Sequence, residues 1–378
     1  MKVIQTVYSE ESGWKTSGDL SAKPQLVLAF SPLELADNQD LYNQLRQRFP
    51  EANLVTASTS ADIYQTEVLN NSIVVSGLEF EKTAIRPIEL NIADFASAYE
   101  LGKSIFKTLN EQADLAHILV ISDGLQINGS ELVAGLSVGN EKKIPITGGL
   151  AGDNARFIKT LVGLNHFPGA GNVVGIGFYG KNIRIGHGSR GGWDPFGPER
   201  VVTRSDRNIL YELDNQSALE LYKKYLGELS KELPGSALLF PLTMKMAESD
   251  VPLVRTILSV DEKDQSMTFA GNIPQGARVQ LMKANFDRVI DAASLAATES
   301  LTTAGTENPD FALLISCVGR KIVLNQRVED EVEDAVSILG SDTMIGGFYS
   351  NGEISPVSTA QGCELHNQTM TITTYREV

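Results

Sequence analysis

The chain is poor in cysteine and histidine and has no long apolar run. It contains two cysteines, Cys317 and Cys363, and four histidines among 378 residues. Two cysteines allow at most one internal disulfide, and a pair of reduced thiols is the simpler interpretation. No apolar run reaches the roughly 18–20 residues of a membrane-spanning helix, and residues 1–6 lack the apolar core of a signal peptide. We therefore expect a cytoplasmic protein that does not cross a membrane.

Positive charge is also scarce. Asp and Glu number 47 against 32 Lys and Arg, which gives a formal net charge of −15. A nucleic-acid-binding surface needs clustered Lys and Arg to contact phosphates, so nucleic acid is not an expected partner. The composition is otherwise ordinary, with 42% hydrophobic and 21% charged residues. A chain of this length is expected to form two domains, or one large composite, with a sizeable core.

What the chain does have is a threefold internal repeat of strand, helix, strand, small-residue bend and strand. The two leading strands of the three copies occupy residues 25–30 and 54–57, 117–122 and 144–147, and 311–316 and 343–348. A strand–helix–strand crossover normally places its two strands in parallel. The pattern predicts an α/β fold, with mixed sheets built from the repeated units and covered by helices.

Each copy has an acidic residue after small residues, at the exit of its second strand. The bends are residues 58–62, 149–153 and 349–353, and they end in Asp62, Asp153 and Glu353 respectively. Ligands of open α/β sheets bind at the carboxyl ends of the strands, so we predict that the bends converge on one small-ligand site. The alternative is that these turns simply need small residues.

A different block separates the second and third copies. Residues 186–193 are rich in glycine and predict a loop between strands. Residues 254–282 have the pattern of a β-meander. We place a domain boundary near residues 229–234, which predicts one domain at 1–230 and a second at 231–378.

Five stretches in this order and spacing resemble the FIST family. They are residues 144–153 (Ile-Pro-Ile-Thr-Gly-Gly-Leu-Ala-Gly-Asp), 202–222, 315–320 (Ile-Ser-Cys-Val-Gly-Arg), 347–354 and 364–373. The resemblance implies an N-terminal and a C-terminal FIST domain and a role as a ligand-sensing module in signal transduction. The chain looks like the stand-alone subgroup, which includes haem-binding nitric-oxide-sensing proteins that regulate a partner histidine kinase or cyclic-di-GMP enzyme. A homodimer is compatible with this interpretation.

A haem sensor needs an axial ligand, usually a neutral imidazole. We predict His366, which lies inside one of the family-like stretches, with His187 and His166 as runners-up. His187 lies near Arg190, which could pair with a haem propionate. His117 begins a buried strand and is expected to be a core residue.

The wider ligand site is predicted from the bends and from the family-like stretches. The predicted ligand-binding residues are Ser60, Asp62, Gly149, Asp153, Arg190, Cys317, Arg320, Ser350, Asn351, Glu353 and Asn367. The backbone N–H groups of the glycine-rich bend suit a ligand carboxylate or amide. The three acids could bind an ammonium group, so an amino-acid sensor without haem is the second interpretation.

A third interpretation is an enzyme that uses a cysteine. Cys363 precedes His366 by three residues, and a thiol with a neighbouring imidazole can act as a nucleophile and its base. No orienting Asp or Asn is identifiable for the pair, and no acyl-transfer signature is present. We therefore predict no catalytic residue.

Overall fold

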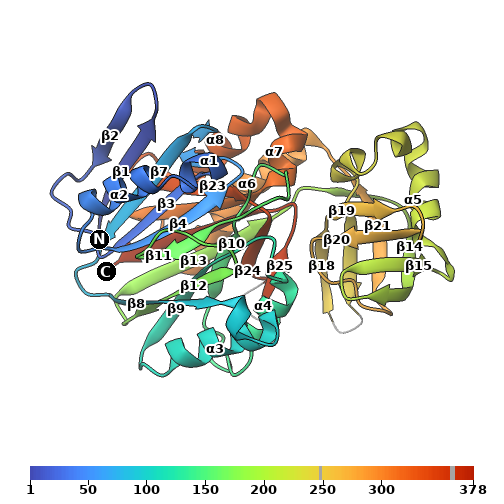
Figure 1. Ribbon diagram of the computed structural model, residues 1–378, viewed down its shortest axis with the longest axis horizontal. Coiled ribbons are helices and arrows are strands. Elements are labelled where there is room, and N and C mark those ends of the chain that lie inside the picture. Colours follow the sequence, from blue (N-terminus) through green and yellow to red (C-terminus); the bar gives the residue numbers. More distant parts are fainter. Residues whose placement is uncertain (247–248, 358–361) are drawn as a thin grey trace.

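The computed structural model describes residues 1–246, 249–357 and 362–378 and has two lobes (Figure 1). The larger lobe contains three six-stranded sheets, and the smaller lobe contains one eight-stranded sheet. Residues 194–283 form the smaller lobe, which lies to the right in Figure 1.

Each sheet of the larger lobe is built on one parallel strand pair from one copy of the repeat. The pairs are β3 (Leu26–Pro32) with β4 (Asn53–Thr59), β9 (Leu115–Ser122) with β10 (Ile146–Leu150), and β22 (Phe311–Cys317) with β23 (Met344–Ser350). The predicted fold class, mixed sheets of repeated strand–helix–strand units covered by helices, is confirmed.

The strand after each bend leaves its own sheet and joins the next one. β5 (Asp62–Tyr64) pairs with β23, β24 (Gly352–Pro356) pairs with β10, and β11 (Val162–Leu164) pairs with β4, all antiparallel. The three exchanges close a ring, so each sheet receives a strand from one neighbour and gives a strand to the other. This exchange brings the three bends to the same end of the lobe.

The remaining strands extend each sheet on the other side of its parallel pair. Next to the pair lie β7 (Ser72–Glu79), β12 (Asn172–Tyr179) and β26 (Met370–Glu377), followed by β1 (Lys2–Ser9), β8 (Ala84–Asn91) and β13 (Ile183–Arg190). β2 (Gly13–Gly18) follows β1, while β25 (Cys363–His366) and β6 (Glu67–Leu69) lie beyond the exchanged strands β24 and β5. The edge strands of the three sheets are therefore β11 and β2, β25 and β8, and β13 and β6.

Alternation along the first strand of each copy fills two kinds of core, because successive side chains of a strand point to opposite faces. One face of each strand packs into a core that all three sheets share, through Leu28 and Phe30, Leu119 and Ile121, and Leu313 and Ile315. The opposite face packs against the covering helices, through Val27 and Ala29, Ile118 and Val120, and Ala312 and Leu314.

The helices of the larger lobe lie on the outer faces of the sheets (Figure 1). They are α1 (Leu33–Ala36), α2 (Gln39–Arg48), η1 (Ile92–Asp94), α3 (Ala98–Asn110), α4 (Gly129–Leu136), α6 (Phe286–Ala304), α7 (Val318–Leu324), η4 (Asn325–Arg327) and α8 (Val328–Leu339). Every helix in the described part of the chain is too short or too polar to span a bilayer.

The smaller lobe packs one helix, α5 (Ala218–Leu226), on its sheet through Leu219 and Tyr222. Its strands are β14 (Asp194–Asp206), β15 (Ile209–Leu213), β16 (Gln216–Ser217), β17 (Leu242–Met246), β18 (Ser249–Arg255), β19 (Ile257–Asp261), β20 (Ser266–Phe269) and β21 (Arg278–Lys283). Two 3-10 helices, η2 (Gly227–Glu232) and η3 (Gly235–Leu239), connect α5 to β17.

The packing cuts across the predicted division into residues 1–230 and 231–378. Strands from beyond residue 230 pair with β5, β10 and β13 of the first segment, and the smaller lobe takes strands from both sides of that position. The division therefore stays a prediction about sequence domains, while the two lobes describe how the chain packs.

Candidate functional site

The three bends meet and are joined by a closed cycle of backbone hydrogen bonds. Each bend donates one N–H to a carbonyl oxygen of another bend. The bonds run from Gly152 N to Ser58 O (2.9 Å), from Ser60 N to Tyr349 O (2.9 Å) and from Asn351 N to Leu150 O (3.1 Å). The predicted convergence of the strand exits is therefore present in the fold.

The cycle also fixes how the three bends correspond. In each bend the donor follows the acceptor by two positions, so residues 150–154, and not 149–153, match residues 58–62. Asn154 then stands where Asp62 and Glu353 stand in the other copies. The three predicted acids are not equivalent.

Asp153 holds its own loop. Its buried carboxylate accepts hydrogen bonds from the backbone N–H groups of Phe157 (3.0 Å), Ile158 (2.7 Å) and Lys159 (3.2 Å). Gly149 is likewise a packing residue, because a Cβ there would lie 2.8 Å from Ile315 Cγ2. The structure gives both residues a structural role.

Asp62 and Lys321 lie at the centre of the junction. Thr59 Oγ1 donates to Asp62 Oδ1 (2.7 Å), while Oδ2 has no partner among the described residues. Burial raises the pKa of Asp62 well above its ordinary value. Lys321 Nζ donates to Ser60 O (2.6 Å) and Asn154 Oδ1 (3.1 Å), so it links two bends.

Glu353 lies under the third bend with both oxygens engaged. Ser350 Oγ donates to Oε1 (2.7 Å), and Thr369 donates to Oε2 from its N–H (3.2 Å) and its hydroxyl (2.9 Å). Burial raises the pKa of Glu353 to about 7. Burial also raises the pKa of the nearby Cys317 thiol, and the Glu353 charge adds to that shift. Cys317 is therefore a protonated core thiol.

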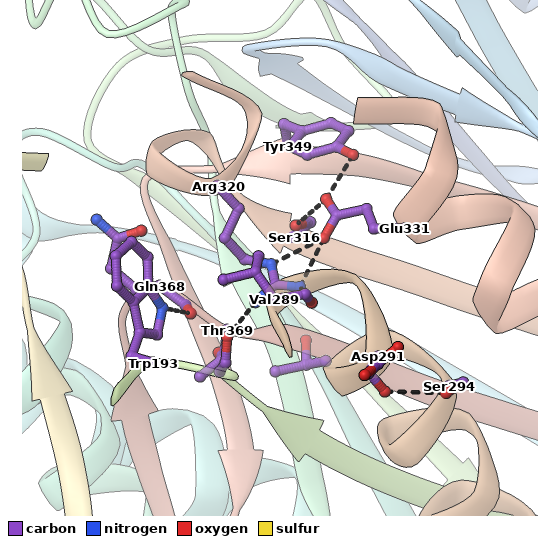
Figure 2. A network of polar contacts seen from close by, with 12 residues as sticks. Trp193, Val289, Asp291, Ser294, Ser316, Arg320, Glu331, Tyr349, Gln368 and Thr369 are labelled. Atoms are coloured by element: carbon purple, nitrogen blue, oxygen red, sulfur yellow. Dashed lines mark hydrogen bonds and ion pairs between the residues drawn. The ribbon is translucent and has the colours of Figure 1, made fainter. Parts of the chain in front are cut away.

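Arg320 belongs to a buried structural network rather than to a ligand site (Figure 2). Its Nε and Nη2 donate to Glu331 Oε2 at 2.9 and 2.6 Å. Its remaining contacts go to Gly191 O (2.6 Å) and Val289 O (2.7 Å). Glu331 also accepts from Tyr349 Oη (2.7 Å). The network ties the third copy to the segment that enters the smaller lobe.

Two histidines are buried and hydrogen-bonded inside sheets. His366 is 8% exposed, and its Nε2 lies 3.0 Å from Ser355 O. His117 Nε2 lies 2.9 Å from Thr147 Oγ1. Burial lowers the pKa of His366 to about 4 and that of His117 to about 3. Both rings are neutral at pH 7.

The contacts of the other two histidines involve none of the bend residues. His166 is exposed and pairs with Glu89 (Nε2 to Oε1, 2.6 Å). His187 is 8% exposed and, together with Cys363, lines a separate cavity of about 270 Å³. Burial lowers the pKa of His187. Arg190 is exposed on the same strand as His187 and pairs with Glu299 (3.3 Å).

A cleft of about 310 Å³ lies between the two lobes and reaches the junction of the bends. Residues 124–129, Leu150, Phe157 and Asn351 of the larger lobe line one side. The smaller lobe contributes Asn208, Leu258, Phe269 and Ala270. Among the described residues, no charged side chain lines this cleft.

Asn351 is the predicted site residue that reaches the cleft. Both atoms of its amide are buried, and neither has a hydrogen-bond partner among the described residues. Its backbone is fixed by the bond to Leu150, while its side chain makes no hydrogen bond to the described residues. Asn367 also has an unpartnered, buried amide, but it does not line the cleft. An unpaired buried polar group indicates a partner such as a ligand or an ordered water.

Sequence reasoning missed most of the cleft. Segment 124–129 follows a buried strand and carries a helix N-cap, Asn128, which was a usable signal. Asn208 and Phe269 come from the smaller lobe, and no local pattern links them to the bends. The meeting point of the three bends contains or covers Ser60, Ser350 and the three acids Asp62, Asp153 and Glu353. Arg190 lies outside it.

The residues that line the interlobe cleft do not fit a haem group. As far as the structure describes this lining, it contains no His, Cys, Met or Tyr, the side chains that serve as axial ligands. In the cavity beside His187, burial raises the pKa of the Cys363 thiol, which disfavours the thiolate that binds iron. Over the described ranges, no cluster of three or more His, Cys, Asp or Glu side chains is placed to hold a metal ion.

Comparison with known proteins gives two family matches. The FIST N domain matches residues 25–216 and the FIST C domain matches residues 218–356. A relative from Methanocaldococcus jannaschii, the uncharacterized protein MJ1623, is 22% identical over 353 residues, which cover 86% of this chain. The match spans 66% of the length of that relative.

A search of solved structures finds a distant likeness to a cyanuric acid hydrolase from A. caulinodans. The likeness covers 78% of this chain and 99% of the hydrolase chain at 10% identity. Its TM-score is 0.18, so neither the fold nor a function is inferred from it.

Proposed function

This chain belongs to the FIST family, and we propose that it is a non-catalytic sensor that binds a small ligand in the cleft between its two lobes. FIST domains are in general small-ligand sensor domains in signalling. The observation that carries the proposal is the unpartnered amide of Asn351, held at the meeting point of the three bends on the wall of the cleft.

The side chains support binding rather than catalysis. The described lining of the cleft includes no Ser, Cys, His, Lys, Asp or Glu, so it offers neither a nucleophile nor a general base. Burial raises the pKa of both cysteine thiols, which disfavours the reactive thiolate. These features disfavour the interpretation as a cysteine-dependent enzyme.

The same geometry favours a sensor without haem. The predicted axial ligand His366 is bonded within a sheet, and no histidine borders the cleft. Recognition of an amino acid through its ammonium group also lacks support. Asp153 and Glu353 are occupied by their own neighbours, and Asp62, whose pKa burial raises, does not line the cleft. A small ligand that hydrogen-bonds to amides fits the lining better.

The signal passes through the contact between the lobes. Beside the cleft, Asn128 Nδ2 donates to Asn272 Oδ1 (3.2 Å) and Arg255 Nη1 donates to Leu365 O (2.9 Å). A ligand held between two lobes favours the arrangement in which both contact it. We propose that a partner in the cytoplasm, a histidine kinase or a cyclic-di-GMP enzyme, responds to this arrangement.

A thermal-shift screen of a metabolite library tests the proposal. Compounds that bind the folded protein at 100 times their Kd stabilise it by about 2.7 kcal/mol. We expect hits with the wild-type chain that are lost in Ala270→Trp, which fills the cleft, and retained in Ala270→Val. Hits that survive in Ala270→Trp contradict the proposal. A haem absorption band that persists in purified protein and disappears in His187→Ala or His366→Ala also contradicts it.

A further inference from the structure

We infer that the ligand of the interlobe cleft is a small uncharged molecule with an amide-like edge, such as a carboxamide, a lactam or a cyclic imide. Asn351 is the residue that forms hydrogen bonds with this edge. The inference rests on the proposed function, since it names the chemical class of ligand for the same cleft.

Because the described lining carries no charged side chain, a charged ligand is disfavoured in this cleft. Placing an isolated carboxylate or ammonium group out of water, without a paired charge, is strongly unfavourable. Arg255, a buried cation that bonds across the lobes, does not line the cleft and is occupied by the carbonyl oxygens of Leu365 (2.9 Å) and Asn272 (3.2 Å). An amino acid, a phosphate ester or a dicarboxylate therefore finds no counter-charge here.

The α4 N-terminus does not supply the missing charge. Asn128 caps the helix by accepting from Glu131 N (3.1 Å), and its amide nitrogen donates across the lobes to Asn272. Both polar atoms of the Asn128 amide are thus engaged in holding the helix and the lobe contact. Asn351 is the side chain of the described lining whose polar atoms are both buried and unpartnered.

An asparagine amide presents both hydrogen-bond donors and acceptors. Each buried polar group left unpaired costs about 1–3 kcal/mol, so a ligand that satisfies the Nδ2 and Oδ1 of Asn351 together recovers a substantial part of that cost. A ligand edge with one N–H beside one C=O meets both atoms. Gly124 packs closely beside this amide, because a Cβ there would lie 3.2 Å from Asn351 Nδ2 and 1.9 Å from Ala151 O.

The rest of the lining suits the flat, apolar body of such a molecule. Leu150 and Phe157 on one side face Leu258 and Phe269 on the other. Apolar walls with a few placed polar groups are typical of small-molecule sites. A ring that carries an amide or imide edge matches both parts of the cleft.

Two pairs of matched probes test the inference by isothermal titration calorimetry on the full chain. Benzamide is compared with benzoate, and uracil with orotate, because each pair differs by a carboxylate. We expect the uncharged member of at least one pair to bind at least tenfold more tightly than its carboxylate. In Asn351→Asp, which keeps the shape but replaces the amide donor by an acceptor, we expect that binding to weaken at least tenfold.

Asn367→Asp is the matched control, since it alters a buried, unpartnered amide that does not line the cleft, and we expect it to retain the binding. Circular dichroism checks that each variant is folded. Tighter binding of the carboxylates, or no binding of any probe, overturns the ligand class. These outcomes leave the sensor proposal intact if library hits are still lost in Ala270→Trp. If no hit depends on the cleft, the proposed function itself fails.

Discussion

Glu353 is a residue whose ionisation is changed by burial. Its pKa rises from an ordinary 4.5 to about 7 because burial disfavours the charged form. The folded state therefore binds this proton more tightly than the unfolded chain. The contribution of Glu353 to stability is greatest below 4.5, falls as pH rises towards 7, and is constant above that value.

Glu353→Gln should remove this pH dependence. The difference in the free energy of unfolding, variant minus wild type, is expected to grow by up to about 3 kcal/mol between pH 4.5 and pH 7. Urea unfolding at several pH values measures it. Glu10→Gln, at an exposed position, controls for the loss of one negative charge. A difference that stays flat over this range would show that Glu353 is ionised throughout.

Among the predicted site residues, the sequence predicted where a residue lies better than what its side chain contacts. Asp153 was predicted as a ligand contact because it ends one of the bends, and Arg320 because it lies in a family-like stretch. Their partners are a loop backbone and Glu331, and neither partner is visible in local spacing. Asn351 was predicted in the same set, and it reaches the cleft because its backbone is fixed by a different copy of the repeat.

Among the elements, the close approach of the two parallel strands of a copy explains why glycine is required inside β10 and β23. These strands lie between a parallel neighbour from their own copy and an antiparallel strand from another copy. A Cβ at Gly148 would lie 1.8 Å from Val120 O, and one at Gly347 would lie 1.8 Å from Leu314 O. The two glycines occupy matching positions in the second and third copies.

Gly347→Ala is therefore expected to destabilise the larger lobe. Its new methyl group meets backbone, which cannot move as a side chain can, so we expect a loss of about 3 kcal/mol, the upper end for overpacking. Chemical denaturation monitored by circular dichroism measures this loss. Gly235→Ala is the control, because nothing lies within 4 Å of a Cβ there. Equal stability of the two variants would contradict the close approach.

The repeated strand–helix–strand units could be predicted from apolar runs, but the exchanged strands could not. β5 and β11 have three residues each, too few for a period, and β5 pairs with a strand far along the chain. Residues 186–193 were predicted as a loop, which was wrong for residues 186–190, since β13 continues to Arg190 and only residues 191–193 lie between β13 and β14. Its glycines allow α6 to approach, because a Cβ at Gly186 would lie 1.9 Å from Ser300 O.

For the whole molecule, the smaller lobe is an insertion into a complete larger one. The chain leaves the larger lobe before β14 and returns after β21, and Asp194 pairs directly with Lys283. The two crossing points therefore lie side by side. All three sheets of the larger lobe close without any strand from residues 194–283. The smaller lobe contributes one wall of the cleft, so binding is a property of both lobes together.

Replacing residues 194–283 by an Asn-Gly turn tests this organisation, because that dipeptide suits a two-residue connection between adjacent antiparallel strands. We expect the shortened chain to fold, with cooperative unfolding monitored by circular dichroism. Its stability should be lower, since Trp193 and Val289 lose the cover of Met282. It should bind none of the compounds that the full chain binds in the cleft. A shortened chain that stays unfolded would show that the larger lobe depends on the smaller one, and retained binding would place the ligand outside the cleft.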